Sequence, residues 1–551
     1  MISISKNEWK FVAIVGVILV IVTFGPIIFG YFNAPPGKVF FPRSTLNYTD
    51  MPIYYSQIEQ ARAGEIFFKR LYTSEQQSAG VLSPFWLLVG WFAKLLSLSS
   101  AVAVQVARLL VIPLLLVVLY YLAAFFFAEP VKRKICFLFF IFASGFGWFA
   151  SLFVTGPEAF FLDVNVPEAF TFPTILSIPH FIVSLALLLL IFLMSLLAFE
   201  SYKLKYSLWA GFCAFLLFSF HPYYVPVIFG VLGLFVLADI ALNRRINWNY
   251  ILHLAITLLF SLPPILYYAW TTFTIPAVHE HYLQNILLTP PLWVVIISYG
   301  FLLPLALLGA FSIFKKPQKT NADIFLLVWF FAQFSFLYLP IKTPRKLSEG
   351  LLMPMVILTM YAALYLKKKL WESTLLQPII SKASTFSRVG KENGPMEWPA
   401  KFFITLFLVL AFGMANIFVA ATDWMFYAMQ DPYFYISSEK YQAMLWLKEL
   451  PRGSIILSET ENGNMIPALT LRQVFIGHGH ETARFVEKKG ASSEFLKGGT
   501  PISRQQFLKK YGITHFFFAP EEKALADFDP TNEPYFKKVY ENGLVTIYEV
   551  I

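Results

Sequence analysis

Residues 180–199 read HFIVSLALLLLIFLMSLLAF, a run of twenty residues that contains no Asp, Glu, Lys or Arg. About 20 apolar residues in a helix are enough to cross a hydrocarbon layer of roughly 30 Å. The whole 551-residue chain has this character, because 57% of it is hydrophobic and 18% aromatic. Only 14% is charged, where a soluble domain usually has about 25%. The mean hydropathy is +0.62. The sequence therefore predicts a polytopic integral membrane protein.

Apolar runs of similar length lie on both sides of this segment. The first of them is longer than the core of a signal peptide and lacks a small-x-small cleavage site, so we expect a signal anchor that stays in place. Counted together with residues 180–199, the runs predict eleven spans. They lie near residues 11–31, 101–128, 136–155, 180–199, 207–220, 223–242, 249–270, 291–314, 323–341, 350–366 and 402–421.

Residues 81–99, VLSPFWLLVGWFAKLLSLS, are amphipathic and carry Pro84, Gly90 and Lys94. We leave this segment out of the count of membrane spans and place the N-terminus inside. Every short loop rich in Lys or Arg, except 341–350, then lies on the cytoplasmic side. The loops at 156–178 and 271–289, which hold no Lys or Arg, are then outside. This is the bias that membrane topology follows, and counting 81–99 as a span would reverse it. We therefore expect this segment to lie along the outer membrane surface as an interfacial or re-entrant helix.

The composition predicts two domains. Residues 1–421 form a transmembrane module with a long outer loop at 32–100 and a cytoplasmic linker at 367–401. Residues 422–551 form an extracytoplasmic soluble α/β domain, in which helical patterns (SSEKYQAMLWLKEL, SRQQFLKKYG) alternate with short β-rich runs (SIILS, QVFIG, THFFFA, VTIYEV).

Two classes of function are excluded by the distribution of charge and cysteine. The net charge is +10, but Lys and Arg gather at the ends of apolar segments, and no basic face interleaved with aromatic residues suggests nucleic-acid binding. The two cysteines, Cys136 and Cys213, lie inside apolar runs and can form neither a disulfide framework nor a zinc cluster.

The outer loops collect polar residues that could carry chemistry. Asp50 in loop 32–100 precedes Met51 and Pro52, and a helix N-cap with Pro in the first turn could by itself account for it. Glu168 precedes a span and His180 lies at its mouth. His221 and Tyr223 belong to the HPYY turn at the membrane edge, where a lone His could also cap a helix.

The segment IKTPRKLSEG is the short outer loop that breaks the positive-inside pattern, with Lys342, Arg345, Lys346 and Glu349. Charges at the edge of a bilayer are costly unless they pair or meet a charged ligand. Two interpretations follow: the cations bind an anion, for which a lipid phosphate is the local candidate, or one of them pairs with Glu349.

In the predicted soluble domain, FIGHGHETARF places His478 two residues before His480. On a strand these side chains would share a face and could chelate a metal. Without a third ligand we favour a loop that folds over the membrane site, and we assign no metal site.

The layout resembles the GT-C superfamily of membrane glycosyltransferases, which includes protein O-mannosyltransferases and aminoarabinose transferases. The similar segments are YTDMPIYY in the long first outer loop, LSPFWLLVGWFAKLL on the membrane surface, AVQVARLL, SGFGW, VPEAFTFP, HPYY, TPRKLSEG and FIGHGHET. The first loop has a lone Asp where protein O-mannosyltransferases have an Asp-Glu pair. The acceptor is therefore left open as a glycan, a lipid or a protein.

The resemblance implies a multi-pass GT-C-like fold and a donor sugar on a polyprenyl phosphate, with Asp50 aligned to the catalytic outer-loop carboxylate. The residues fit this chemistry, because a lipid phosphate leaves without a general acid, and one carboxylate can take the proton of the acceptor hydroxyl. Arg345 and Lys346, with His180, would hold the departing phosphate. A single displacement predicts inversion at the anomeric carbon. The accessory residues are Glu168, His221, Tyr223 and Glu349.

Other interpretations stay open. No cofactor is certain, and a divalent metal near Glu168 and His221 is an alternative role for those residues. A lipid or polysaccharide flippase, or a non-catalytic membrane assembly subunit, would also be multi-pass. Transporters usually carry polar residues at mid-membrane and repeated halves, whereas the spans here are nearly free of charge, Arg108 being the main exception.

Overall fold

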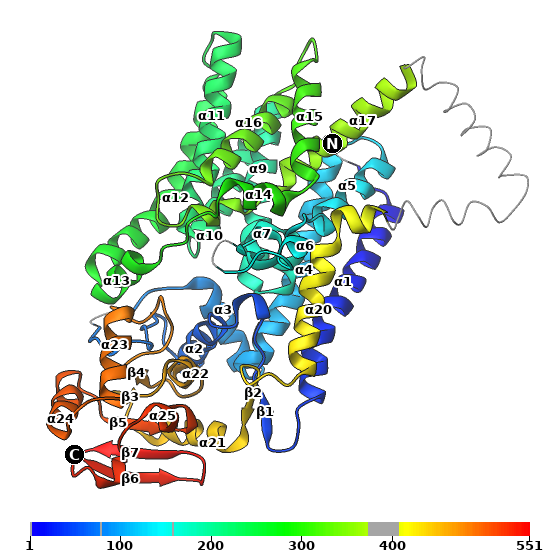
Figure 1. Ribbon diagram of the computed structural model, residues 1–551. Coiled ribbons are helices and arrows are strands. Elements are labelled where there is room, and N and C mark those ends of the chain that lie inside the picture. The colour runs from blue at the N-terminus through cyan, green and yellow to red at the C-terminus, as the bar shows by residue number, and fades with distance from the viewer. Residues whose placement is uncertain (1–2, 78–79, 157–158, 373–406) are drawn as a thin grey trace, which may run out of the picture. The chain divides into compact units, whose positions relative to one another are not determined.

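The computed structural model describes residues 3–77, 80–156, 159–372 and 407–551 (Figure 1). The chain divides into two compact units. Unit 1 comprises Met1–Thr23, Leu110–Pro263 and Leu287–Thr422, and unit 2 comprises Phe24–Leu109, Pro264–Ile286 and Asp423–Ile551. Four helices contribute residues to both units: α1 (Lys6–Phe32), α4 (Ser100–Phe126), α12 (Trp248–Thr274) and α20 (Met414–Ala428).

The described residues contain seven helical segments that are long and apolar enough to cross a membrane. They confirm a multi-pass α-helical membrane protein. Besides α1, α4 and α12, they are Pro130–Ala150 with α5 (Pro130–Phe142) and α6 (Gly147–Ala150), α9 (Pro179–Ser201), Pro222–Asn243 with η4 (Pro222–Tyr224) and α11 (Val225–Asn243), and Pro344–Lys369 with η5 (Pro344–Ser348) and α17 (Leu352–Glu372).

Other predicted spans correspond to shorter or broken helices, so the count of eleven stays a prediction. α10 (Leu204–Phe218) and α16 (Asn321–Phe336) have 15 and 16 residues. α14 (Leu292–Tyr299) and α15 (Leu302–Phe314) form a pair bent by 83°. Residues 373–406, which include most of the predicted cytoplasmic linker and the start of the last predicted span, lie outside the described residues.

Two spans predicted as continuous are interrupted at one common place in unit 1. The predicted span 136–155 breaks after Phe142, and the predicted span 291–314 bends at Gly300, which has a φ of +50°. The backbone N–H of Phe146 donates to the carbonyl of Ile297 at 3.0 Å. A Cβ at Gly145 would lie 2.0 Å from the carbonyl oxygen of Ser298. The SGFGW turn therefore packs directly on the bend between α14 and α15.

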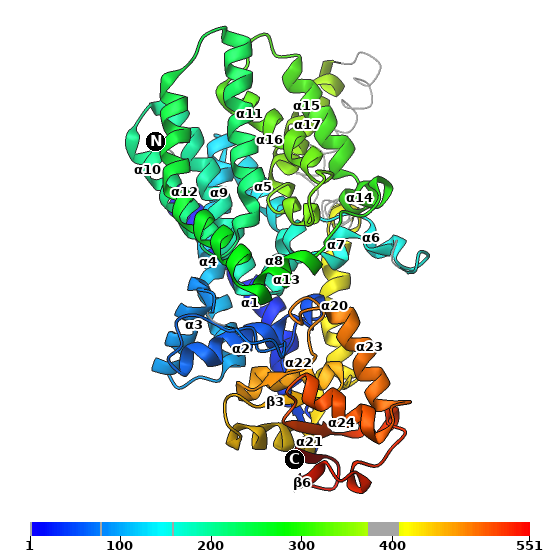
Figure 2. The ribbon, with the colours of Figure 1, turned by 90° about the vertical axis from the view of Figure 1, so that its left-hand side faces the viewer.

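Paired helices build the rest of unit 1. α9 packs on α10, α11 on α16, and α15 on α17, as Figure 2 shows for the green helices. A buried histidine links three of the helices: His253 of α12 bonds Ser207 of α10 through Nδ1 and Ser195 of α9 through Nε2, each at 2.9 Å. Such interhelical hydrogen bonds hold helices together where lipid supplies no hydrophobic driving force.

The segment 81–99 forms α3 (Pro84–Leu95), which has 12 residues. At 1.5 Å per residue it extends about 18 Å and is too short to cross a bilayer. One face packs on α2 (Met51–Arg62), because a Cβ at Gly90 would lie 2.3 Å from the Cβ of Ala61. The opposite face exposes Leu88, Trp91 and Leu95. This amphipathic form agrees with an interfacial helix, and its place on the outer surface stays a prediction.

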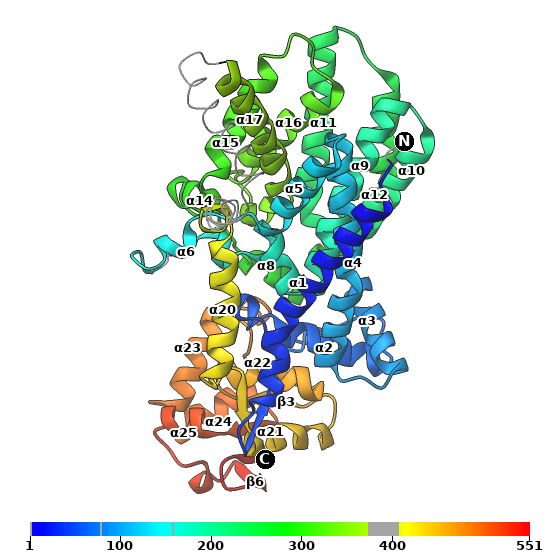
Figure 3. The ribbon, with the colours of Figure 1, turned by 90° about the vertical axis from the view of Figure 1, so that its right-hand side faces the viewer.

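The C-terminal region of unit 2 contains the predicted α/β fold (Figure 3). Its five-stranded sheet has the order β4-β3-β5-β7-β6, with β4, β3 and β5 parallel and β5, β7 and β6 antiparallel. Phe475, Phe495 and Phe516 are buried in its core. The strands are β3 (Ile455–Leu457), β4 (Gln473–Val474), β5 (His515–Phe518), β6 (Phe536–Glu541) and β7 (Thr546–Val550), and the helices are α21 (Ser438–Trp446), α22 (Thr460–Thr470), α23 (Phe485–Leu496), α24 (Pro501–Lys510) and α25 (Pro520–Leu525).

The predicted outer loop is tied into the same unit. β1 (Lys38–Phe40) pairs antiparallel with β2 (Tyr435–Ser437). Loop 32–100 and the C-terminal region are therefore parts of one compact unit, although we predicted them in separate domains. The division at residue 421/422 stays a prediction.

Candidate active site

Asp50 occupies the N-cap position of α2, but its side chain makes no capping hydrogen bond. Its Oδ1 instead lies 2.9 Å from Nε2 of His478. About a third of the Asp50 side chain is exposed (34%), whereas His478 is buried. Asp50 therefore lies at the N-cap of α2, but its carboxylate bonds to His478 and not to a backbone N–H of the helix. The carboxylate is accessible from solvent.

His478 reaches Asp50 from a loop rather than from a strand. β4 ends at Val474, so His478 and His480 do not share a strand face, and their ring centroids are 5.8 Å apart. No group of three or more His, Cys, Asp or Glu side chains that could hold a metal is found in the part of the chain that the structure describes. The FIGHGHET segment is therefore a loop beside Asp50, as we favoured. A placement over the membrane stays a prediction.

An ion cluster holds this loop. Glu481 pairs with Arg70 from loop 32–100, and Nδ1 of His281 lies 3.3 Å from its other carboxylate oxygen. Burial is the largest single influence on Glu481 and would raise its pKa, but the charge and hydrogen bond of Arg70, together with His281 and His478, lower this pKa to about 2. Burial also lowers the pKa of His281 to about 4. At neutral pH the loop is thus held by a carboxylate, a guanidinium and a neutral imidazole.

Backbone atoms of the same loop are held by α13 (Pro276–Gln284). Nδ1 of His281 donates to the carbonyl of His480 at 2.9 Å, and Nε2 of Gln284 donates to the carbonyl of Thr482 at 2.7 Å. The hydroxyl of Thr482 in turn donates to the carbonyl of Tyr72 at 2.7 Å. Segments near residues 70, 280 and 480 therefore fix one another inside unit 2.

α22 supports the other side of Asp50. The amide of Asn464 donates to the carbonyl of Thr49 at 3.0 Å. The buried guanidinium of Arg43 pairs with Glu461 at 2.7 Å, at the start of α22. The ENGN run thus begins a helix that packs against α2 and fixes the backbone next to Asp50.

The remaining predicted site residues lie in unit 1, around three one-turn 3₁₀ helices. η5, which holds Arg345 and Lys346, packs against both η4 and η3 (Pro167–Ala169). η4 begins directly after His221 and supplies Tyr223, and η3 supplies Glu168. The motifs TPRKLSEG, HPYY and VPEAFTFP, which lie far apart in the sequence, therefore meet in one place.

The two cations of η5 lie against aromatic rings. Nζ of Lys346 is 4.6 Å from the ring centroid of Tyr223, and the guanidinium carbon of Arg345 is 4.6 Å from that of Phe160. Both cations are half-buried. Cations above aromatic faces gain about 0.5–2 kcal/mol, which helps to keep these two charges at an apolar edge.

His221 and His180 lie beside Lys346. Their ring centroids are 4.9 Å apart, and the His221 ring is 4.9 Å from that of Tyr223. Burial, and then the charges of His180 and Lys346, hold the pKa of His221 well below its usual value. His221 is therefore neutral at neutral pH. Its buried Nδ1 has no hydrogen-bond partner in the described residues.

Glu349 is fully buried and does not pair with the cations. Its Oε1 accepts a hydrogen bond from the hydroxyl of Ser184 at 2.5 Å. Among the residues that the structure describes, no ion pair joins it to Arg345 or Lys346, so the salt-bridge interpretation of TPRKLSEG is wrong. Gln333 donates to the carbonyl of Glu349 at 2.6 Å and to that of Leu347 at 2.8 Å. These bonds fix the backbone that follows Lys346.

A buried acid that we did not single out, Asp163, lies in the same unit. Its Oδ2 accepts the backbone N–H of Gly147 at 2.9 Å, and burial raises its pKa to about 8. A Cβ at Gly147 would lie 2.0 Å from its Oδ1. Asp163 thus holds the SGFGW turn. In the sequence, the signal that could have indicated this close contact was Gly147 of that motif. Arg70 and His281 had no comparable signal in the sequence.

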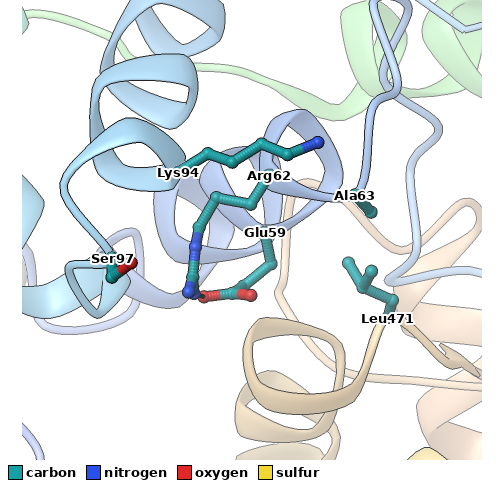
Figure 4. A pocket seen from close by; sticks show the side chains of 6 residues that line it. All are labelled: Glu59, Arg62, Ala63, Lys94, Ser97 and Leu471. Carbon is teal, nitrogen blue, oxygen red and sulfur yellow. Dashed lines mark hydrogen bonds and ion pairs between the residues drawn. The ribbon is translucent and has the colours of Figure 1, made fainter.

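Unit 2 also contains a small pocket of about 340 Å³ beside α2 and α3 (Figure 4). Glu59, Arg62, Lys94 and Leu471 are among the residues that line it. Arg62 is paired with Glu59 at 2.5 Å. None of the predicted site residues lines this pocket, and we assign it no role.

No protein-family model and no curated protein matches the chain. Solved structures do match the chain. The apo oligosaccharyltransferase of Archaeoglobus fulgidus has a TM-score of 0.56 at 14% identity, and the match covers 98% of this chain and 74% of that chain. The same archaeal enzyme, AglB, in complex with an inhibitory peptide and a dolichol-phosphate gives a TM-score of 0.50 at 14% identity, with the same coverage of 98% and 74%.

The arabinofuranosyltransferase AftD from Mycobacteria has a TM-score of 0.52 at 14% identity, covering 99% of this chain and 42% of that chain. These neighbours are GT-C glycosyltransferases. The chain therefore has the GT-C-type fold, as the resemblance of its sequence implied.

Proposed function

We propose that the protein is a membrane glycosyltransferase that moves a sugar from a polyprenyl-phosphate donor to an acceptor hydroxyl on the extracytoplasmic side. The fold supports the class of reaction, because similar structures are glycosyltransferases. One of them was solved with a dolichol-phosphate and an inhibitory peptide. The acceptor, whether a glycan, a lipid or a protein, and the identity of the sugar remain open.

The observation that carries the proposal is the accessible carboxylate of Asp50, which is held by His478 and does not cap its helix. Asp50 acts as the general base. The acceptor oxygen forms a bond to the anomeric carbon while its proton passes to the Asp50 carboxylate. The bond from the anomeric carbon to the phosphate oxygen breaks, and its electron pair leaves with the lipid phosphate. One displacement inverts the anomeric configuration.

Arg345 and Lys346, with His180, take the charge of the departing phosphate. Support comes from their setting: both cations are half-buried against aromatic rings. Donors that are already in place when charge develops are the usual way in which enzymes stabilise a leaving anion. In the proposal, the acceptor is oriented by Glu168, His221, Tyr223 and Glu349.

Glu168 and His221 offer two side chains, fewer than the four ligands that zinc usually takes or the six or more of calcium. Magnesium, which keeps several waters and is often held by one or two carboxylates together with substrate phosphates, would fit these residues better. No step of the proposed reaction passes through a metal.

The experiment compares the purified wild-type protein with Asp50→Asn, using polyprenyl-phosphate-linked sugars and a panel of acceptor glycans, lipids and peptides. Asn keeps the shape and the hydrogen bond but cannot accept the proton. We expect transfer by the wild type and a loss of at least about 100-fold in Asp50→Asn, the size expected for removal of a general base. Product stereochemistry is read by NMR.

The matched control is Glu65→Gln, which removes another acid of the same loop that is exposed and pairs with Arg452 at the surface. Its activity should stay near that of the wild type. Transfer that survives Asp50→Asn, or a product with retained configuration, would refute the mechanism. A flippase or an assembly subunit would show no transfer with any donor and would tolerate Asp50→Asn in cells.

A further inference from the structure

The imidazole of His478 has only one protonation state that satisfies its neighbours. Its Nδ1 lies 3.2 Å from the backbone nitrogen of His480 and 3.3 Å from that of Glu481. Backbone N–H groups can only donate, so Nδ1 must accept and carries no proton. The ring is therefore neutral, its proton is on Nε2, and Nε2–H donates to Oδ1 of Asp50 at 2.9 Å.

The loop that holds this imidazole is fixed at both ends. Before His478, a Cβ at Gly477 would lie 2.7 Å from the carbonyl of Gly463 in α22, so the backbones touch. The N–H of Gly477 donates to the hydroxyl of Thr482 at 3.0 Å, which closes the loop on itself. After His478, Glu481 is locked by Arg70 and His281.

These contacts give His478 little freedom to follow a moving partner. A buried imidazole in a closed loop is a fixed donor, and the Asp50 carboxylate that it meets is partly exposed. A hydrogen bond to an ionised carboxylate is stronger than one between neutral groups. The bond therefore selects one rotamer of Asp50 and favours its ionised form, which is the form that accepts a proton.

We propose that His478 is the positioning residue of the general base: the GHGHET loop (residues 477–482) of the C-terminal region orients the Asp50 carboxylate. This inference rests on the proposed function of Asp50. His478 donates one hydrogen bond and transfers no proton to the substrate. The C-terminal region thereby has a part in the transfer step itself and is more than an anchor.

The first test measures kcat and KM for the donor in His478→Ala, His478→Gln and His480→Ala, in the full-length protein. Gln places an amide N–H close to the position of Nε2, and Ala does not. We expect kcat to fall about 10- to 100-fold in His478→Ala with KM for the donor changed less than about threefold, because a lost bond to a charged group has this size. His478→Gln should recover kcat to within about fivefold of the wild type.

His480→Ala removes an imidazole two residues away and leaves the backbone hydrogen bonds of residue 480 in place, so its kcat should stay within about twofold of the wild type. An unchanged kcat in His478→Ala overturns the inference. Equal losses in the Ala and Gln variants, with equally lowered Tm, also overturn it, because they mark a purely structural residue. If Asp50→Asn is inactive in the same assay, the proposed function stands in either case.

A second test needs no activity. Diethylpyrocarbonate modifies imidazoles, and mass spectrometry follows His478 against His480 in the wild type and in Asp50→Ala. Loss of the Asp50 bond should speed modification of His478 at least threefold and leave His480 unchanged. Equal rates at His478 in the two proteins would show that the bond to Asp50 does not form.

Discussion

Lys346 is a cation with an unusual neighbourhood. Its Nζ lies 4.6 Å from the ring centroid of Tyr223 and 6.0 Å from that of Phe181, beside the neutral His221. If it binds the donor phosphate, Lys346→Met should raise KM for the donor and lower kcat/KM by about 10- to 100-fold, as expected for loss of a charge-assisted hydrogen bond. Lys346→Arg keeps the charge and should retain most of the activity. Initial rates over a series of donor concentrations measure both.

The control for Lys346 is Lys319→Met, at an exposed lysine that donates to the carbonyl of Lys316 on a predicted cytoplasmic loop. It should behave as the wild type. If Lys346→Met keeps the wild-type KM and kcat, Lys346 does not bind the phosphate, and its contact with Tyr223 serves the fold alone.

Glu481 and His281 make the stability of unit 2 depend on pH. The pKa of Glu481 is about 2 in the fold, below its ordinary value near 4.3. The pKa of His281 is about 4, below its ordinary value near 6.5. In each case the unfolded chain binds the proton more tightly, so stability falls as pH falls. The stability that depends on neutral His281 is lost between about pH 6.5 and 4, and the stability that depends on ionised Glu481 is lost between about pH 4.3 and 2.

Hydrogen exchange of the GHGHET loop should therefore speed up as pH drops from 7 to 5, after correction for the intrinsic exchange rate. His281→Phe should remove most of this pH dependence, since Phe cannot bind a proton, although the loop loses its bond to the carbonyl of His480. A loop that exchanges equally at pH 7 and pH 5 in the wild type would contradict the lowered pKa of His281.

At the scale of elements, the GHGHET loop offers two glycines with opposite expectations. A Cβ at Gly477 would lie 2.7 Å from the carbonyl of Gly463 and 3.1 Å from Cδ1 of Tyr72, whereas a Cβ at Gly479 meets nothing within 4 Å. Gly477→Ala should destabilise the protein by about 1–3 kcal/mol, as overpacking does, and should lower transferase activity by moving His478. Gly479→Ala should be neutral. Thermal unfolding in detergent measures the stability of both variants.

The helices were predictable where the backbone depends on local composition. Apolar runs such as 180–199 gave α9 nearly to the residue, because any 20-residue apolar helix satisfies its backbone in lipid. The break after Phe142 and the bend at Gly300 were missed, since each depends on the other: the SGFGW turn packs on the carbonyl of Ser298, and the sequence contains no local sign of that distant contact.

The same reasoning applies to the candidate site. Arg345 and Lys346 were found because two positive charges on a predicted outer loop violate a general rule of topology. Asp50 was found from its setting in the first loop, but its bond to His478 spans 428 positions of sequence, and only the fold brings the two together. The spacing of His478 and His480 was also compatible with a shared strand face, which we did not favour, and the strand ends at Val474, before either of them.

At the scale of the whole molecule, sidedness depends on which short helices cross the membrane. Between residues 65 and 282 the sequence predicts six spans, which would place both positions on the same side. The helices long enough to span by themselves in this interval are α4, Pro130–Ala150, α9, Pro222–Asn243 and α12. Five crossings would place the two positions on opposite sides. The 15-residue α10 is therefore decisive, and so is the absence of a crossing by α3.

Cysteine labelling distinguishes these topologies. Replacing Cys136 and Cys213, both buried, by Ala gives a background without cysteine. Single cysteines then replace Glu65, Tyr282 and Ser503, predicted outside, and Arg245 and Lys319, predicted inside; all but Tyr282 are charged or polar surface residues, and Tyr282 is 48% exposed. A membrane-impermeant maleimide should label positions 65, 282 and 503 in intact cells, and positions 245 and 319 only after permeabilisation. Labelling of 65 without 282 would mean that α10 does not cross or that α3 does. It would then place Asp50 and the loop of Lys346 on opposite faces of the membrane, where they could not act on one donor.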